Sequence, residues 1–230
     1  MKKTIPYLIL FIFLMMFFYR CFFLGEVIFP ASMFYKMYPF AKSEIGEKYF
    51  KENPADEFSE RWNALQFDCV LEFYPWRHYL GECYKQGKIP VNNEYSFCGK
   101  SFFMANGQSA VFYPLNILFV VFPTPVAFTV FIILHVFLLQ IFMYIYLKRL
   151  KLCSAAALFG TLAFGYSAFV INWLMLPTFV SVITWLPLIA YCMHRFFENI
   201  SSENRGTDTK KRDDYKFAVL GGIFLALSFL

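Results

Sequence analysis

The chain has 230 residues, of which 59% are hydrophobic and 22% aromatic, and its formal net charge is +5. One soluble core does not use so many apolar side chains, so the composition indicates an integral membrane protein. The basic residues lie at the ends of apolar runs and form no stripe with interleaved aromatic residues, which argues against binding to nucleic acid.

The first apolar run covers residues 5–24 and follows two lysines. At about 20 residues it is long enough to cross about 30 Å of hydrocarbon. A basic start and an apolar centre also fit a secretory signal peptide, but no cleavage site with small residues follows. We therefore interpret residues 1–25 as a first transmembrane helix that is not removed.

Residues 26–109 form a long polar segment with nine Lys or Arg and eleven Asp or Glu. We expect this segment to be an extracytoplasmic loop. Between Pro54 and Lys88 its apolar and aromatic residues recur at a spacing that predicts interrupted amphipathic helices at the membrane surface. Pro75 is expected to begin one of these helices, and Gln86-Gly87 to end it.

The next segment, residues 110–197, contains more apolar sequence than one span needs, and Pro123-Thr124-Pro125 interrupts it. We expect a short re-entrant or interfacial helix followed by transmembrane helices 2–4. In chain order, these helices are predicted at Val111–Phe122, Val126–Leu147, Leu152–Leu176 and Phe179–Phe197.

A hydrophilic segment, residues 198–216, is predicted to be a flexible cytoplasmic loop, and residues 217–230 the start of a fifth, truncated transmembrane helix. The predicted inner segments carry eleven basic and five acidic residues, whereas residues 26–109 have an acidic excess. By the positive-inside rule the N-terminus then lies in the cytoplasm and residues 26–109 lie outside.

Asp68 and Glu72 are four residues apart, so both carboxylates lie on one face of a helix. They suit either a divalent cation or a general base whose pKa the second carboxylate adjusts. The simplest alternative is the solvated face of an amphipathic helix. The six cysteines contain no CxxC pair and no zinc-type spacing with histidine, so a thiolate metal site is not expected.

Aromatic and basic residues follow this pair within about three helical turns. Tyr74 and Trp76 suit either a platform for stacking a sugar or a membrane-interface belt. Arg77 suits a phosphate, a headgroup or a pairing with Glu72, and His78 suits either a proton shuttle or an ordinary surface position.

Amide side chains precede the next apolar run, at Asn106, Gln108 and Asn116. An amide at a membrane boundary is costly unless it is paired. These side chains therefore either satisfy freed backbone groups or line a hydrated cavity, and the sequence leaves both readings open.

Residues between positions 68 and 116 follow a recognisable order. The set comprises Asp68, Tyr74-Pro75-Trp76, Gly87-Lys88-Ile89-Pro90, Asn93, Gly99, Ala105-Asn106-Gly107-Gln108 and Phe112-Tyr113-Pro114-Leu115-Asn116. This order resembles the first outer loop of bacterial YfhO-type membrane proteins, which are polytopic proteins of the GT-C glycosyltransferase type. The resemblance covers about residues 1–195, and its specific part runs from Asp68 to Asn116. The chain departs from it at Val91-Asn92-Asn93, where the family usually has a Trp-Asn pair.

The resemblance implies an all-α polytopic membrane protein with GT-C-like helices. It also implies transfer of a sugar from a polyprenyl-phosphate donor to a cell-envelope glycan, such as lipoteichoic acid, on the outer face of the cell membrane. An acidic residue of the first outer loop lies at the reaction centre of GT-C enzymes, and Asp68 is the matching position. The candidates for substrate contacts are Glu72, Tyr74, Trp76, Arg77, His78, Asn93, Asn106, Gln108 and Tyr113.

Two other classes of protein remain open, namely a transporter or flippase of a lipid-linked sugar and a non-catalytic membrane subunit. Transporters more often show internal repeats and charged or broken helices in mid-membrane. The spans after Arg20 carry no acidic residue. His135, which lies deep in a span, is expected to be packed or hydrogen-bonded to a neighbouring helix.

Overall fold

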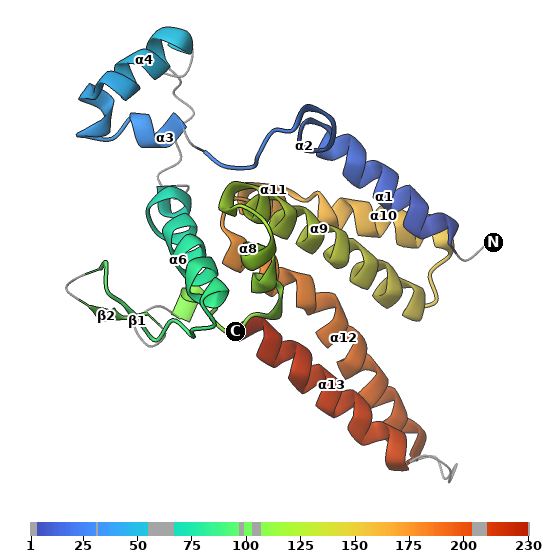
Figure 1. Cartoon of the computed structure of the whole chain (residues 1–230). Coiled ribbons are helices and arrows are strands. Elements are labelled where there is room, and N and C mark those ends of the chain that lie inside the picture. Colours follow the sequence, from blue (N-terminus) through green and yellow to red (C-terminus); the bar gives the residue numbers. More distant parts are fainter. Residues whose placement is uncertain are drawn as a thin grey trace. The chain divides into compact units, whose positions relative to one another are not determined.

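The computed structural model describes residues 4–30, 32–54, 67–96, 99–102, 107–203 and 211–229, and most of these are helical (Figure 1). They divide into two compact units. The first, called the helical unit, comprises residues 1–25, 112–114 and 130–230. The second, called the polar unit, comprises residues 26–111 and 115–129.

Among the described residues, three helices are long and apolar enough to cross a membrane. They cover Thr124–Arg149 (α9), Ser154–Asn172 and Pro177–Ile200, the last lying within α12, Pro177–Glu203. Residues 126–147, predicted to form a spanning helix, lie within α9. The helical unit also contains two shorter apolar helices, α1 at Ile5–Phe17 and α13 at Lys211–Phe229.

The second of the three candidate spans is broken. Its first part, α10, covers Ser154–Gly165, and its second part, α11, covers Ala168–Asn172. Ser167 lies between them, and its hydroxyl accepts a hydrogen bond from the backbone N–H of Val170, as an N-cap residue does. A new helix therefore starts immediately after the first one ends.

Two further sequence-based boundaries in the helical unit need correction. The apolar run over residues 5–24 forms two helices, α1 and α2 (Tyr19–Leu24), which meet at Phe18. The polar segment predicted to be a loop over residues 198–216 contains the end of α12 and the start of α13, and residues 204–210 lie outside the described residues. Helical hydrogen bonding thus continues past the apolar residues at both ends of this segment, because each added residue gains a bond at little further cost.

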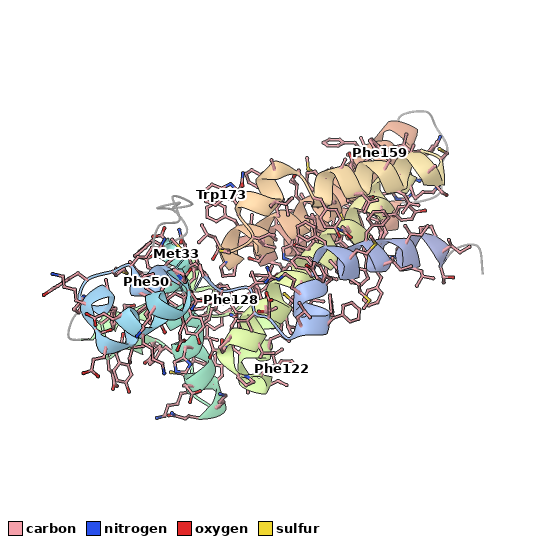
Figure 2. All side chains as sticks on the ribbon, turned by 90° about the horizontal axis from the view of Figure 1, so that it is seen from above. Met33, Phe50, Phe122, Phe128, Phe159 and Trp173 are labelled. Carbon is pink, nitrogen blue, oxygen red and sulfur yellow. The ribbon has the colours of Figure 1, made fainter. Side chains whose placement is uncertain are left out.

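Apolar packing holds the helical unit together. Leu10 of α1, Tyr144 of α9 and Ala157 of α10 form one buried cluster, and the rings of Tyr7 and Tyr144 meet edge to face at 5.5 Å. The same helices also expose large apolar side chains, and Phe159 of α10, labelled in Figure 2, is 76% exposed. Apolar surface of this kind on long apolar helices is what contact with lipid requires.

The polar unit consists of short helices and one hairpin. Its helical segments are α3 (Ser32–Tyr35), η1 (Phe40–Lys42), α4 (Glu44–Glu52), the π-helical turn η3 (Cys69–Phe73), α6 (Tyr74–Lys85), η4 (Gly107–Ser109), η5 (Pro114–Ile117) and α8 (Leu118–Val121). Its described strands are β1 (Asn92–Asn93) and β2 (Lys100–Ser101), which pair antiparallel with Asn93 opposite Lys100. Residues 111–122, predicted as one re-entrant or interfacial helix, instead form a loop and these last two short turns.

α6 is the helix around which the polar unit packs. It begins at Tyr74 with Pro75 in its first turn, and it ends at Lys85, after which Gly87 has φ +69°. Both boundaries agree with the prediction from Pro75 and Gln86-Gly87. Gly81 lies against α8, where an added Cβ would come within 2.7 Å of the Phe119 carbonyl oxygen. A larger residue would therefore separate α6 from α8.

Candidate functional site

The two predicted carboxylates lie at the turn that leads into α6. Asp68 immediately precedes η3 and Glu72 lies within it, and both side chains are exposed. Cys69, Val70 and Phe73, from the same turn, are buried. The turn is therefore amphipathic, with both carboxylates directed to its solvated side and an apolar side that fixes it to the polar unit.

Arg77 is only 1% exposed and connects α6 to two other segments of the polar unit. Its Nη1 donates to the Ser109 carbonyl oxygen at 2.9 Å and to Asn116 Oδ1 at 2.8 Å. The guanidinium also lies 6.0 Å from the centre of the Phe119 ring. A direct contact between Arg77 and a phosphate would require these interactions to open, so its place in the structure is that of an internal anchor.

Asn116 completes this anchor. Its side chain is fully buried, and its Nδ2 donates to the Ala110 carbonyl oxygen while its Oδ1 accepts from Arg77. Of the two sequence-based readings for this amide, the structure supports the one in which it satisfies a freed backbone carbonyl.

His78 is the next residue of α6 and is exposed, but its ring is positioned. Its Nδ1 lies 2.9 Å from the hydroxyl of Thr124. One turn further along, Glu82 forms an ion pair with Lys85 at 2.8 Å, and the hydrogen bond from this lysine lowers the pKa of the Glu82 carboxyl. The imidazole of His78 is therefore exposed on the surface of the polar unit, and its contact with Thr124 fixes its orientation.

The predicted aromatic residues of α6 pack inside the polar unit. The Tyr74 ring lies 4.4 Å from that of Phe29 and 6.3 Å from that of Phe128, and burial raises the pKa of Tyr74. The Trp76 ring meets Phe73 at 5.5 Å. Both rings are half-buried, so only part of each is available for stacking on a ligand.

The hairpin of the polar unit is joined to α6 through tyrosine. Tyr79 Oη donates to the Asn92 carbonyl oxygen at 2.7 Å, and burial, with the Cys83 thiol adding to it, raises the pKa of Tyr79 to about 12. Asn93 is buried, and its Oδ1 accepts from the Tyr95 backbone N–H at 3.0 Å while its Nδ2 donates to Ser96 Oγ. Asn93 thus shapes the turn that follows it, as asparagine often does.

The remaining predicted site residues do not belong to α6 or to the turn that precedes it. Gln108 belongs to η4 and is exposed, and Asn106 lies outside the described residues. Tyr113 belongs to the helical unit and is buried there. The structure therefore brings Tyr74, Trp76, Arg77 and His78 together on α6, with Asp68 and Glu72 on the preceding turn.

Tyr113 takes part in a directed hydrogen-bond chain within the helical unit. His135 Nδ1 lies 2.7 Å from the Phe131 carbonyl oxygen, so in a neutral ring this nitrogen carries the proton and Nε2 accepts. The Tyr113 hydroxyl, 2.6 Å away, then donates to Nε2, and Trp185 Nε1 donates to the Tyr113 oxygen at 3.1 Å. Sequence reasoning missed Trp185 as a partner, since 72 residues separate it from Tyr113.

Asp68 and Glu72 alone do not make a complete cation site. Among the described residues no group of three or more His, Cys, Asp or Glu side chains is close enough to hold a metal ion. Asp68 and Glu72 would therefore hold a divalent cation only if water and a substrate phosphate supplied the other ligands, as is common for Mg²⁺.

The reactivity of Cys69 tests whether the apolar side of the carboxylate turn, Asp68–Phe73, is buried as described. It is fully buried, and desolvation raises the pKa of its thiol to about 12. At pH 8 about 10⁻⁴ of such a thiol is ionised, against roughly a quarter of an unperturbed one. We expect maleimide to label the exposed Cys153 within minutes and to leave Cys69 unlabelled, as measured by peptide mass spectrometry. Equal labelling of the two cysteines would show that the turn is not packed as described.

Comparison with protein-family models, with curated proteins and with solved structures finds no match to this chain. The structure itself defines the class: the described part is a mostly helical protein with one two-residue hairpin ladder and three helices long and apolar enough to cross a membrane.

Proposed function

We propose that the protein is a polytopic membrane glycosyltransferase of the GT-C type. In this proposal it transfers a sugar from a polyprenyl-phosphate donor to a cell-envelope glycan on the outer face of the cell membrane. The long apolar helices and their exposed apolar side chains support a membrane location. The ordered residues from Asp68 to Asn116 support the family.

We further propose that the N-terminus lies in the cytoplasm and that residues 26–109 lie outside. The charge distribution supports this orientation, because Lys148, Arg149 and Lys151 cluster at the end of α9 and its following turn. The first outer loop would then supply α6 and the carboxylate turn on the outer side of the membrane.

The exposed carboxylate pair carries the chemical proposal. Asp68 takes the proton of an acceptor hydroxyl, and the resulting oxygen attacks the anomeric carbon of the donor sugar. The bond from this carbon to the phosphate oxygen breaks, and the electron pair leaves with the polyprenyl phosphate. A phosphate is already a good leaving group, so holding the acceptor and removing its proton are the main tasks of the protein.

A transporter of a lipid-linked sugar is the second candidate, because one observation favours it. The candidate span Ser154–Asn172 is broken between Gly165 and Ala168. Broken helices within the membrane commonly form the binding sites of transporters.

One assay separates these classes. The purified full-length protein is placed in liposomes with a radiolabelled polyprenyl-phosphate sugar and an envelope glycan. Incorporation of label into the glycan supports the glycosyltransferase. Movement of labelled donor between the leaflets without incorporation would instead identify a transporter. The absence of both activities would leave a non-catalytic subunit, and either of these last two results overturns the proposal.

A further inference from the structure

Gln140 is a fully buried amide in the apolar part of the helical unit. It lies on α9, in the interior of a candidate membrane span. Neither its Oε1 nor its Nε2 has a hydrogen-bond partner among the described residues. Burying an amide in such a place costs several kcal/mol unless it is hydrogen-bonded, so the lack of a partner for Gln140 needs an explanation.

The Gln140 side chain packs against the break between α10 and α11. A Cβ added at Gly165, the last residue of α10, would lie 2.8 Å from Gln140 Cγ and 3.1 Å from its Nε2. Gly165, which has no side chain, thus leaves the space that the Gln140 side chain occupies. Because α10 stops here, the regular ladder of helical hydrogen bonds is interrupted at the same level.

Tyr166 adds a second buried polar group at this place. It follows Gly165 directly, its ring lies 4.8 Å from that of Phe17, and its buried hydroxyl interacts with the Gln140 side chain without forming a hydrogen bond of regular geometry. The neighbouring polar residue on α10, Thr161, donates to the Ala157 carbonyl oxygen at 2.7 Å, so its hydroxyl hydrogen is not available to either group.

The two side chains cannot satisfy one another. A glutamine amide offers two donor hydrogens on nitrogen and two acceptor positions on oxygen, whereas a tyrosine hydroxyl offers one donor and two acceptor positions. A direct bond between them would pair only one end of the Gln140 amide. The other end would remain buried without a partner, so a third group is needed.

We propose that the break between α10 and α11 is a binding site for an ordered water molecule held by Gln140 and Tyr166. Water both donates and accepts, so one molecule can serve the amide and the hydroxyl together, and buried waters typically make about three hydrogen bonds. A bare cation fits poorly, because α9, α10 and α11, which meet at this place, contain no Asp or Glu. This water site holds the broken span against α9 and is independent of sugar transfer.

Stability measurements test whether the two groups act through a shared partner. Gln140→Met keeps the length of the side chain and Tyr166→Phe removes only the hydroxyl. Each single variant should lower the melting temperature of the full-length protein by about 2–4 °C, since it strips partners from the water and from the remaining group. The double variant should melt no lower than the less stable single variant. A rise in melting temperature on Gln140→Met, or additive losses, would overturn the proposal.

A second measurement separates bound water from a direct contact between the two side chains. In solid-state NMR of the protein in lipid bilayers, magnetisation passes from water protons to nearby side-chain amide nitrogens. The Gln140 signal, assigned by its loss in Gln140→Met, should receive more magnetisation than that of Asn116. Asn116 is equally buried, and both ends of its amide bond to protein atoms. Transfer to Gln140 that is equal to or weaker than transfer to Asn116 rules out the water site.

Discussion

Replacing Asp68 by Asn is expected to lower the rate of sugar transfer by about 10²- to 10⁴-fold, the usual contribution of a general base. Asparagine keeps the shape of the side chain but cannot accept the proton of the acceptor hydroxyl. Asp68 is exposed at the start of η3, so the change should leave the melting temperature within about 1 °C of the wild type. The measurement is incorporation of label from a polyprenyl-phosphate sugar by the full-length protein in membranes.

The matched control for this prediction is Glu82→Gln. Glu82 is an exposed acid on α6 whose described partner is Lys85, so its loss removes one surface ion pair and nothing from the carboxylate turn. Such a pair contributes little to stability. Transfer at the wild-type rate by the Asp68→Asn protein would refute the role of Asp68 as the base. A similar loss of sugar transfer in the Glu82→Gln protein would show that the rate depends on the surface charge of this region and not on Asp68 in particular.

Arg77→Met is expected to lower the free energy of unfolding by about 2–5 kcal/mol. The change leaves two buried acceptors, the Ser109 carbonyl and Asn116 Oδ1, without the charged donor that now serves both. Arg77→Lys should recover only part of the loss, because an ammonium group does not have the fork-shaped donor geometry of a guanidinium. Chemical unfolding of the purified protein in detergent, followed by circular dichroism, measures the difference.

Lys85→Met provides the comparison on the same helix. Lys85 is exposed and pairs with Glu82 alone among the interactions described for it, so its replacement should change the free energy of unfolding by less than about 1 kcal/mol. If Arg77→Met unfolds like Lys85→Met, the buried anchor contributes nothing and the polar unit is held by apolar packing alone.

Local signals were enough to place several helices. Pro75 and Gly87 mark the two ends of α6 because proline suits a first helical turn and glycine readily adopts a positive φ. The apolar run after Pro125 similarly marks α9. The break at Phe18 and the extension of α12 to Glu203 carry no such local signal. In the second case, an ion pair between Arg149 and Glu198 joins the polar end of α12 to α9, and such a contact depends on tertiary structure.

The candidate site was predictable only in part, for a similar reason. The exposure of Asp68 and Glu72 follows from their spacing on an amphipathic turn. The burial of Arg77 could not be predicted in this way, because the sequence does not distinguish a buried arginine from one that binds phosphate. Its partners Ser109 and Asn116 lie 32 and 39 residues away, and nothing in the intervening sequence indicates that they meet.

The discontinuous make-up of the polar unit matters for protein engineering. A recombinant fragment that ends at residue 109, the end of the predicted outer loop, would omit residues 115–129, which belong to the same unit. It would lack Asn116, which bonds to Arg77, and Phe119, against which Gly81 packs. A fragment of the polar unit intended for antibody selection or crystallisation should therefore have residues 115–129 grafted behind residue 111 through a short flexible linker.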